Sequence, residues 1–324
     1  MNTSSFSSKI SKFQSTIALI LLCILISLLS DKFLTVDNGW NVLRQISVNI
    51  CISVGMTLVV LTAGIDLSVG SILAISGAIA AGLLKSGISI PELDLFIGFT
   101  LLGALLAGVL TGASLGFFNG WVITKFKVPP FVATLAMLTV ARGFTMLWTK
   151  GYPISSLGSN FAVIGTGWFL GIPILVWIAC VIIFLAIIIS NKTPLGRYIY
   201  AIGGNENAAR LSGININKIK IIVYSIAGGL AAIGGIMVTS RLDSAQPNAG
   251  MSYELDAIAA VVIGGTSLSG GRGTIIGTVL GAIIIGVLNN GLVLLDVSPF
   301  WQQVVKGIVI LLAVMIDKAN SKAE

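Results

Sequence analysis

Long apolar runs with almost no charge limit the fold of this chain more than any other feature. The run IPILVWIACVIIFLAIII at 172–189 is one of them. Strands of a membrane β-barrel would alternate apolar and polar residues over about 10 positions, and this run does not alternate. An open sheet would leave unpaired backbone groups in hydrocarbon, at several kcal/mol each. We therefore expect an all-α, polytopic membrane helical bundle.

The composition agrees with lipid as the main solvent. Hydrophobic residues make up 56% of the 324 positions and charged residues only 10%, with a mean hydropathy of +1.01. A soluble domain carries about 25% charged residues. The 38 glycines allow close helix packing, as in GALLAG at 103–108. The net charge of +7 is spread over short loops, which excludes a nucleic-acid surface.

A spanning helix needs about 20 apolar residues. The first segment with this character follows Lys9 and Lys12 but lacks a small-x-small cleavage site, so we expect an uncleaved anchor. The third and eighth segments are short and are not expected to be simple perpendicular spans. We predict a single transmembrane domain over 1–324 with ten spans: 14–30, 46–63, 69–84, 95–120, 131–149, 171–190, 219–240, 254–266, 273–295 and 300–316.

The basic residues give the orientation. With the N-terminus cytoplasmic, 12 lysines and arginines lie inside and 5 outside, which satisfies the positive-inside rule and puts both termini in the cytoplasm. The inside set is Lys9, Lys12, Lys125, Lys127, Lys192, Arg197, Arg210, Lys218, Lys220, Arg272, Lys318 and Lys322. The outside set is Lys32, Arg44, Lys85, Lys150 and Arg241.

No catalytic or cofactor site is expected in this chain. Cys23, Cys51 and Cys180 are far apart in apolar segments and no histidine is present, which argues for buried single thiols and against a metal site. The string GTSLSGGR at 265–272 has Gly271 where a P-loop needs lysine, and no strand precedes it. We interpret this string as a coincidence.

A faint repeat suggests two helix breaks. GIDLSVG at 64–70 and GTSLSGG at 265–271 share the pattern G-x-x-L-S-x-G. Transport sites are commonly built from such interrupted helices. Asp66 either couples an ion or caps the next helix, and we favour the cap. The helix-break candidates are Gly64, Asp66, Gly70, Gly265 and Gly271.

Other polar residues fall within the predicted spans. Lys306 is near its helix end and is expected to extend toward water. Arg142 lies more centrally and faces either a water-lined path or a buried acid. Four asparagines either line a path or tie helices together. The path candidates are Asn49, Asn119, Arg142, Asn289 and Asn290.

The longest predicted cytoplasmic loop, 191–218, contains a polar stretch that predicts a short helix over 205–213. A helix this short is unstable alone, so it needs a surface to contact. Its small alanines favour a groove on another protein over lipid headgroups. The residues that carry this prediction are Asn205 as N-cap, Glu206, Ala208, Ala209 and Leu211 as helical residues, and Gly213 at the position that ends the helix.

At this loop the chain resembles the permease subunits of ATP-binding-cassette (ABC) sugar importers. The strings LGRYIYAIGGNENAARLSGININKIK, GMTLVVLTAGIDLSVGS and SAQPNAGMSYELDAIAAVVIGGTSLSGGRGTIIGT are similar to that family, and the similarity runs over about 32–316. It implies a homodimer with ten spans of the vitamin B12-importer kind. In such importers a loop helix with an E-A-A-x-x-x-G pattern fits a cleft on the ATPase. Ala208, Ala209 and Gly213 match, whereas Glu206 is displaced by Asn207.

The resemblance implies a non-catalytic subunit of the bacterial inner membrane. Its partners would be a second copy, a cytoplasmic ABC ATPase that carries the ATP and magnesium, and a periplasmic sugar-binding protein. Arg44, Lys150 and Arg241 are candidates to dock that binding protein. Ribose is the first expectation, with other pentoses, galactose or the furanosyl autoinducer as alternatives. An ion-coupled secondary sugar transporter that uses Asp66 is the rival class.

Overall fold

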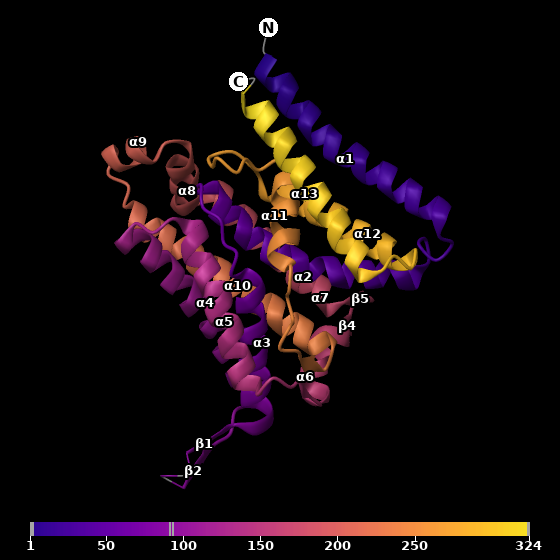
Figure 1. Ribbon diagram of the computed structural model, residues 1–324, viewed down its shortest axis with the longest axis vertical. Helices are drawn as coiled ribbons and strands as arrows, with labels where there is room; N and C mark the ends of the chain where they lie inside the picture. Colours follow the sequence, from indigo (N-terminus) through magenta and orange to yellow (C-terminus); the bar gives the residue numbers. More distant parts are fainter. Residues whose placement is uncertain (1–2, 91, 93, 323–324) are drawn as a thin grey trace. The chain divides into compact units, whose positions relative to one another are not determined.

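The computed structural model describes residues 3–90, 92 and 94–322, with side chains for 15–89, 92 and 94–315. The side chains of Lys9, Lys12, Lys318 and Lys322, which entered the charge count, lie outside this description. The helices are α1 (Thr3–Leu29), α2 (Val36–Leu61), α3 (Val69–Ser86), α4 (Leu101–Phe126), α5 (Pro130–Thr149), α6 (Ser159–Thr166), α7 (Ile174–Lys192), α8 (Pro194–Gly204), α9 (Glu206–Leu211), α10 (Ile216–Arg241), α11 (Tyr253–Ile263), α12 (Ile275–Leu294) and α13 (Pro299–Lys322) (Figure 1).

Short antiparallel strand pairs lie between some of these helices. The pairs are β1 (Ile88–Ile90) with β2 (Leu95–Ile97), β3 (Ile154–Ser155) with β6 (Ser244–Ala245), and β4 (Trp168–Phe169) with β5 (Ile172–Pro173). Strand β2 occupies the start of the predicted 95–120 span, so the helix there begins only at Leu101.

Each of the ten predicted spans corresponds to one helix, and the expectation of an all-α membrane protein is confirmed. Among the described residues, seven helices are long and apolar enough to cross a membrane: α2, α3, α4, α5, α7, α10 and α12. Helices α1 and α13 contain shorter apolar stretches, Ser15–Leu29 and Pro299–Met315. Helix α11 has 11 residues, about 17 Å at 1.5 Å per residue, which is too short for a perpendicular span.

The chain divides into two compact units that are interleaved along the sequence. Unit 1 comprises Met1–Ala63, Val181–Ile214 and Leu255–Glu324; unit 2 comprises Gly64–Cys180 and Asn215–Glu254. The apolar pattern does not predict this division, because all ten segments have similar composition.

Unit 2 is built around α4, which packs against α10 and α3 (Figure 1). One face of α4 has glycine at every fourth position, and these residues are buried: Gly108, Gly112, Gly116 and Gly120. A methyl group at Gly116 would lie 2.9 Å from the Tyr224 carbonyl carbon and 3.2 Å from the Gly228 Cα of α10. The hydrophobic effect does not drive helix association within lipid. The van der Waals contacts of these closely packed backbones stabilise the pair instead.

Unit 1 is built around α2, which packs against α12 and α8, while α1 packs on α12. Helix α2 is buried without a break from Ile46 to Leu61, consistent with its apolar sequence. The hydroxyls of Thr57 and Thr278 lie 2.7 Å apart and join α2 to α12. Satisfying both polar groups inside the bundle avoids an unpaired hydroxyl in hydrocarbon.

The prediction of three buried thiols was correct only in part. Cys51 is buried in α2, Cys23 is half-buried, and Cys180 is exposed on α7. An apolar run does not show which side faces the protein when nearly every position is hydrophobic, so the exposure of Cys180 could not be inferred.

Candidate functional site

In unit 2 the chain enters α3 through a buried, non-helical turn at 64–68. Asp66 is fully buried, and its Oδ1 accepts hydrogen bonds from the Ser68 N–H at 2.9 Å and from the Ser68 hydroxyl. Asn119 of α4 donates to the Ser68 hydroxyl oxygen at 2.9 Å. Because Ser68 itself precedes the first helical residue, Asp66 fixes the turn and does not cap the helix directly. The capping interpretation is corrected in that respect.

Other helices of unit 2 hold the same turn from two sides. The carbonyl of Ile65 accepts a hydrogen bond from Thr134 of α5 at 3.3 Å and one from the Tyr224 hydroxyl of α10 at 3.5 Å. Irregular backbone inside a membrane protein is tolerated where protein groups satisfy it. The Oδ2 atom of Asp66 is buried and has no hydrogen-bond partner among the described residues.

A second irregular segment follows α10. After β6 the chain stays non-helical from Gln246 to Ser252, where α11 begins at Tyr253. Gly250, with φ +70°, packs directly on α3: a methyl group there would lie 3.0 Å from the Leu73 side chain and 3.2 Å from the Gly70 carbonyl carbon.

This second segment turns back into the bundle. Near the end of α10, a methyl group at Gly77 of α3 would lie 3.0 Å from the Gly235 carbonyl oxygen and would overlap Thr239. Gly70 lies about 10 Å farther along α3, at 1.5 Å per residue. Gly250 contacts Gly70, whereas the last turns of α10 contact Gly77. Between the end of α10 and Gly250 the chain therefore runs back along α3 by about 10 Å. Helix α11 is therefore short because consecutive turns, with bonds such as Ala249 N–H to the Gln246 carbonyl, take the place of its first part.

Arg142 connects α5 to this segment, which we name the re-entrant segment (residues 246–252). Its Nη1 donates to the carbonyls of Pro247 at 2.7 Å and Ala249 at 2.9 Å. The negative charge of Glu254 also acts on this guanidinium. Between the two bound carbonyls, the side chain of Asn248 is exposed. The alternatives for Arg142 were a water-lined path and a buried acid. It binds backbone carbonyls, which neither alternative named, and the acid Glu254 acts on it as well.

The sequence-predicted residues Asp66, Gly70, Asn119 and Arg142 thus belong to one unit, around two breaks. Gly70 lies inside the first turn of α3, where it permits the contact with Gly250. Next to Gly64, the left-handed conformation is adopted by Ala63, with φ +57°. Sequence reasoning missed the re-entrant segment. The Pro-Asn-Ala-Gly string there was a signal for irregular backbone.

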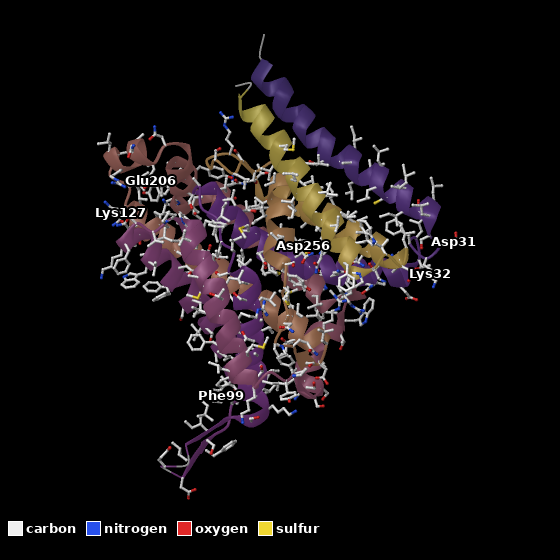
Figure 2. The ribbon with its side chains drawn as sticks, viewed as in Figure 1. Asp31, Lys32, Phe99, Lys127, Glu206 and Asp256 are labelled. Atoms are coloured by element: carbon white, nitrogen blue, oxygen red, sulfur yellow. The ribbon has the colours of Figure 1, made fainter. Side chains whose placement is uncertain are left out.

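Unit 1 contains a buried ion pair that the sequence analysis also missed. Lys306 of α13 donates to Asp256 of α11, which is labelled in Figure 2, at 3.0 Å. Asn289 of α12 donates to the same carboxylate oxygen at 3.3 Å. The side chains of Lys306 and Asp256 are 21% and 4% exposed. The prediction that Lys306 extends to water was wrong, because a carboxylate on another helix binds it. An acid and a base in two separate apolar runs were the available signal.

The remaining asparagine candidates are buried in unit 1. Asn290 of α12 and Asn38 of α2 exchange side-chain hydrogen bonds of 2.8 and 3.1 Å. Asn49 is 7% exposed within α2. Asn290 therefore joins two helices, which was one of the two alternatives considered.

The predicted short helix in the 191–218 loop is present as α9 (Figure 2). The Asn205 side chain accepts from the Ala208 N–H at 3.0 Å, as an N-cap should. At the other end Gly213 has φ +82°, and the N–H groups of Gly213 and Ile214 bond to the carbonyls of Arg210 and Ala209. These two bonds form a Schellman motif.

Helix α9 turns one small residue inward and its large apolar residue outward. Ala209 is 5% exposed, whereas Leu211 is 90% exposed. Glu206 forms an exposed ion pair with Arg210 at 3.4 Å, so it supports the helix locally. An apolar side chain this exposed at a helix end is a candidate contact for another protein.

Helix α8 attaches α9 to the rest of unit 1. A methyl group at Gly203 would lie 3.0 Å from the Gly271 Cα, and the Gly271 N–H donates to the carbonyl of Leu61 at 3.0 Å. The Tyr200 hydroxyl donates to the Gly273 carbonyl at 2.9 Å, and burial raises the pKa of this tyrosine. The predicted break residues Gly265 and Gly271 both have positive φ, at +82° and +72°.

The three docking candidates differ in exposure. Lys150 is exposed and ends α5 in a left-handed conformation. Arg241 is half-buried at the end of α10, because Gly165 of α6 packs on its backbone. Arg44 is half-buried within α2 instead of lying in a loop. Of the three candidates, only Lys150 is exposed.

Comparison with known proteins identifies the family. A family model described as branched-chain amino acid transport system, permease component, matches residues 39–314. The ribose import permease protein RbsC of Haemophilus influenzae is 52% identical over 94% of this chain and 92% of its own. The proteins of the same name from Bacillus subtilis (52% identical; 98% and 95% covered) and Escherichia coli K12 (51%; 94% and 92%) are similarly close. No solved structure matches this chain. The chain belongs to this permease family and is a non-catalytic, multi-pass inner-membrane permease component.

Proposed function

We propose that this protein is the membrane permease subunit of an ABC importer and that its substrate is ribose. Three relatives at 51–52% identity carry the name ribose import permease, which supports this substrate above another pentose, galactose or the furanosyl autoinducer. ATP and magnesium bind a separate cytoplasmic ATPase, and a periplasmic binding protein delivers the sugar. The whole chain acts as one domain, with ten spans of the vitamin B12-importer kind and both termini in the cytoplasm. Two copies form the path.

Helix α9 is the observation that carries this proposal. It is a capped helix with an outward leucine, joined through α8 to the core of unit 1. A capped element of this kind transmits force better than a flexible loop. We assign Asn205, Glu206, Ala208, Leu211 and Gly213 to the contact with the ATPase. Ala209, which was also expected there, is 5% exposed and turned inward, so it anchors α9 instead. Closure of the ATPase dimer moves α9, and the permease changes between two packed arrangements as a rigid body.

The path for the sugar runs past the two breaks of unit 2. A sugar needs hydrogen-bond partners at membrane depth, where apolar helices offer few. The re-entrant segment supplies the exposed amide of Asn248 and the half-buried amide of Gln246. Arg142 acts as a positioning residue, because it holds the backbone on both sides of Asn248. Asn119 supports the neighbouring turn. Asn289, through Asp256, and Asn290, through Asn38, tie helices of unit 1 together, and Asn49 is buried in the same unit.

Of the docking candidates, exposed Lys150 is the strongest for an acidic surface of the binding protein. Half-buried Arg241 and Arg44 are weaker for this role, because less of each side chain is accessible.

The rival function is secondary transport coupled to an ion at Asp66. The buried Oδ2 atom of Asp66, which has no described hydrogen-bond partner, is the observation in its favour. The two functions differ in energy source. The permease alone in vesicles should not concentrate ribose under a proton or sodium gradient. Together with its ATPase, binding protein and ATP, it should.

A single substitution tests the role of α9. Leu211→Asp introduces a charge at a 90% exposed site, so folding should be unaffected while copurification of the ATPase and ATP-driven ribose uptake are lost. Leu34→Asp, at a leucine that is 78% exposed outside α9, is the matched control and should leave copurification unchanged. Normal ATPase binding and uptake by the Leu211→Asp protein would refute the proposed coupling.

A further inference from the structure

A groove of about 610 Å³ runs along the outside of unit 2, between α4 and the first half of α10. Its walls are mainly apolar at one end and polar at the other. The apolar part includes Phe117 of α4 with Ile222 and Ile226 of α10; the polar part includes Asn215, Asn217 and Lys218. We propose that this groove binds one anionic phospholipid, with an acyl chain on the apolar part and the phosphate at Lys218.

The apolar part has the shape that an acyl chain needs. Ile222 and Ile226 are one helical turn apart, and Lys218 is one turn before Ile222, so all three lie along one side of α10. From Lys218 to Ile226 the groove follows the helix for about 12 Å. Phe117, 51% exposed, forms the opposite wall. The groove therefore follows the axis of α10, a helix long and apolar enough to cross a membrane.

The polar end can bind a phosphate. The side chains of Asn217 and Lys218 are exposed, and the first turn of α10 carries no acidic residue. The side-chain oxygen of Asn215 accepts from the Lys218 N–H at 3.0 Å, which leaves its amide NH₂ as a donor. The Lys218 ammonium has no ion-pair or hydrogen-bond partner among the described residues. A phosphate diester would supply the missing negative charge.

Aromatic residues of α4 indicate where the lipid headgroups lie. The ring of Trp121 lies 5.2 Å from that of Phe126 in an edge-on arrangement, and the Lys125 ammonium lies 4.9 Å from the centre of the Trp121 ring. Tryptophan and lysine are typical of the membrane–water interface. Gly120, the neighbour of Trp121, packs against Ile221 of α10.

Lys218 is about one turn beyond Ile221 toward water, at headgroup level, and the isoleucines extend into hydrocarbon. The excess of basic residues expected on the cytoplasmic side favours the inner leaflet. Basic pockets between helices on that side bind anionic headgroups. A phospholipid supplies both a negative phosphate for Lys218 and an acyl chain for the apolar part. An apolar helix of another protein would cover the apolar part but would bring no negative charge to Lys218.

Native mass spectrometry of the full-length protein can test the proposal with two probes, phosphatidylglycerol and phosphatidylcholine. Lys218→Ser removes the charge, and Ile226→Trp fills the apolar part while keeping the charge. We expect Lys218→Ser to lose about fivefold in phosphatidylglycerol affinity, the effect of about one lysine near a lipid surface. Ile226→Trp should also lose phosphatidylglycerol, because its ring occupies the space of the acyl chain. Phosphatidylcholine should bind more weakly than phosphatidylglycerol to the unmodified protein.

Lys127→Asn is the matched control, because Lys127 lies at the same end of α4 but outside the groove, and asparagine tolerates its φ of +55°. This variant should bind phosphatidylglycerol like the unmodified protein. Equal affinity for the two lipids, or unchanged binding after either groove substitution, would overturn the proposal. So would a loss of self-association without a loss of lipid, since the groove would then be a subunit interface.

Discussion

Replacing Arg142 by methionine removes the hydrogen bonds that hold the re-entrant segment while keeping a side chain of similar length. Two charge-assisted bonds, of 2.7 and 2.9 Å, end at the carbonyls of Pro247 and Ala249. Bonds to charged groups contribute about 1.5–3 kcal/mol each. The arginine is only half-buried, so part of this gain offsets its own desolvation. We estimate a net loss of about 2–4 kcal/mol for the native arrangement of the segment.

That loss corresponds to a shift of about 30-fold to 900-fold between the held and released arrangements of the segment. Hydrogen exchange measured in detergent or nanodiscs should show faster exchange for residues 246–252, with α4 and α10 unchanged. Ribose uptake with the ATPase and binding protein should fall strongly, because the amides of Gln246 and Asn248 would lose their fixed positions. Arg142→Lys should be intermediate, since lysine keeps a charged donor on a different stem.

Thr139→Met is the control for this experiment. Thr139 is exposed on the same helix, and its hydroxyl bonds only to its own helix, at the carbonyl of Ala136. This variant should exchange and transport like the unmodified protein. If Arg142→Met also left both exchange and uptake unchanged, Arg142 would not be the residue that positions the segment.

Two further predictions concern packing within each unit. In unit 2, Gly116→Ala should lower the stability of the purified protein by about 1–3 kcal/mol, seen as a lower melting temperature, because its methyl group would lie 2.9 Å from the Tyr224 carbonyl carbon. Gly143→Ala, with nothing within 4 Å of the new methyl group, should have no such effect, and equal melting temperatures would contradict the packing argument. In unit 1, Lys306→Met should cost up to about 3–5 kcal/mol by leaving Asp256 uncompensated. The double change Lys306→Met with Asp256→Asn should recover most of it, and failure to recover would show that the charges are not coupled.

Local patterns predicted the elements well. The apolar runs located the helices, and Asn205 and Gly213 predicted both ends of α9, because N-caps and left-handed C-terminal residues act within a few positions along the chain. The glycines at 108–120, four residues apart on one side of a helix, were also a readable signal for close packing, although the sequence analysis pointed only to Gly108 among them.

Which polar groups bind each other across different helices was much less predictable. The pairing of Asp256 with Lys306 joins positions 50 residues apart, and the bond from Arg142 to Ala249 joins positions 107 apart. Several polar residues in similar apolar surroundings allow many pairings. Lys306 illustrates the problem: without its partner, extension toward water was the reasonable expectation.

The amino-acid sequence by itself determined that this protein is a helical membrane permease with a short capped helix in its longest predicted cytoplasmic loop, because hydrophobicity, capping and charge bias are properties of neighbouring residues. Only the tertiary structure decided that the chain folds into two interleaved units, that α11 is shortened by a re-entrant segment, and which carbonyls Arg142 binds. The physical reason is that an apolar run has the same affinity for lipid and for another apolar helix. Contacts between distant backbones and polar groups choose among the possible arrangements.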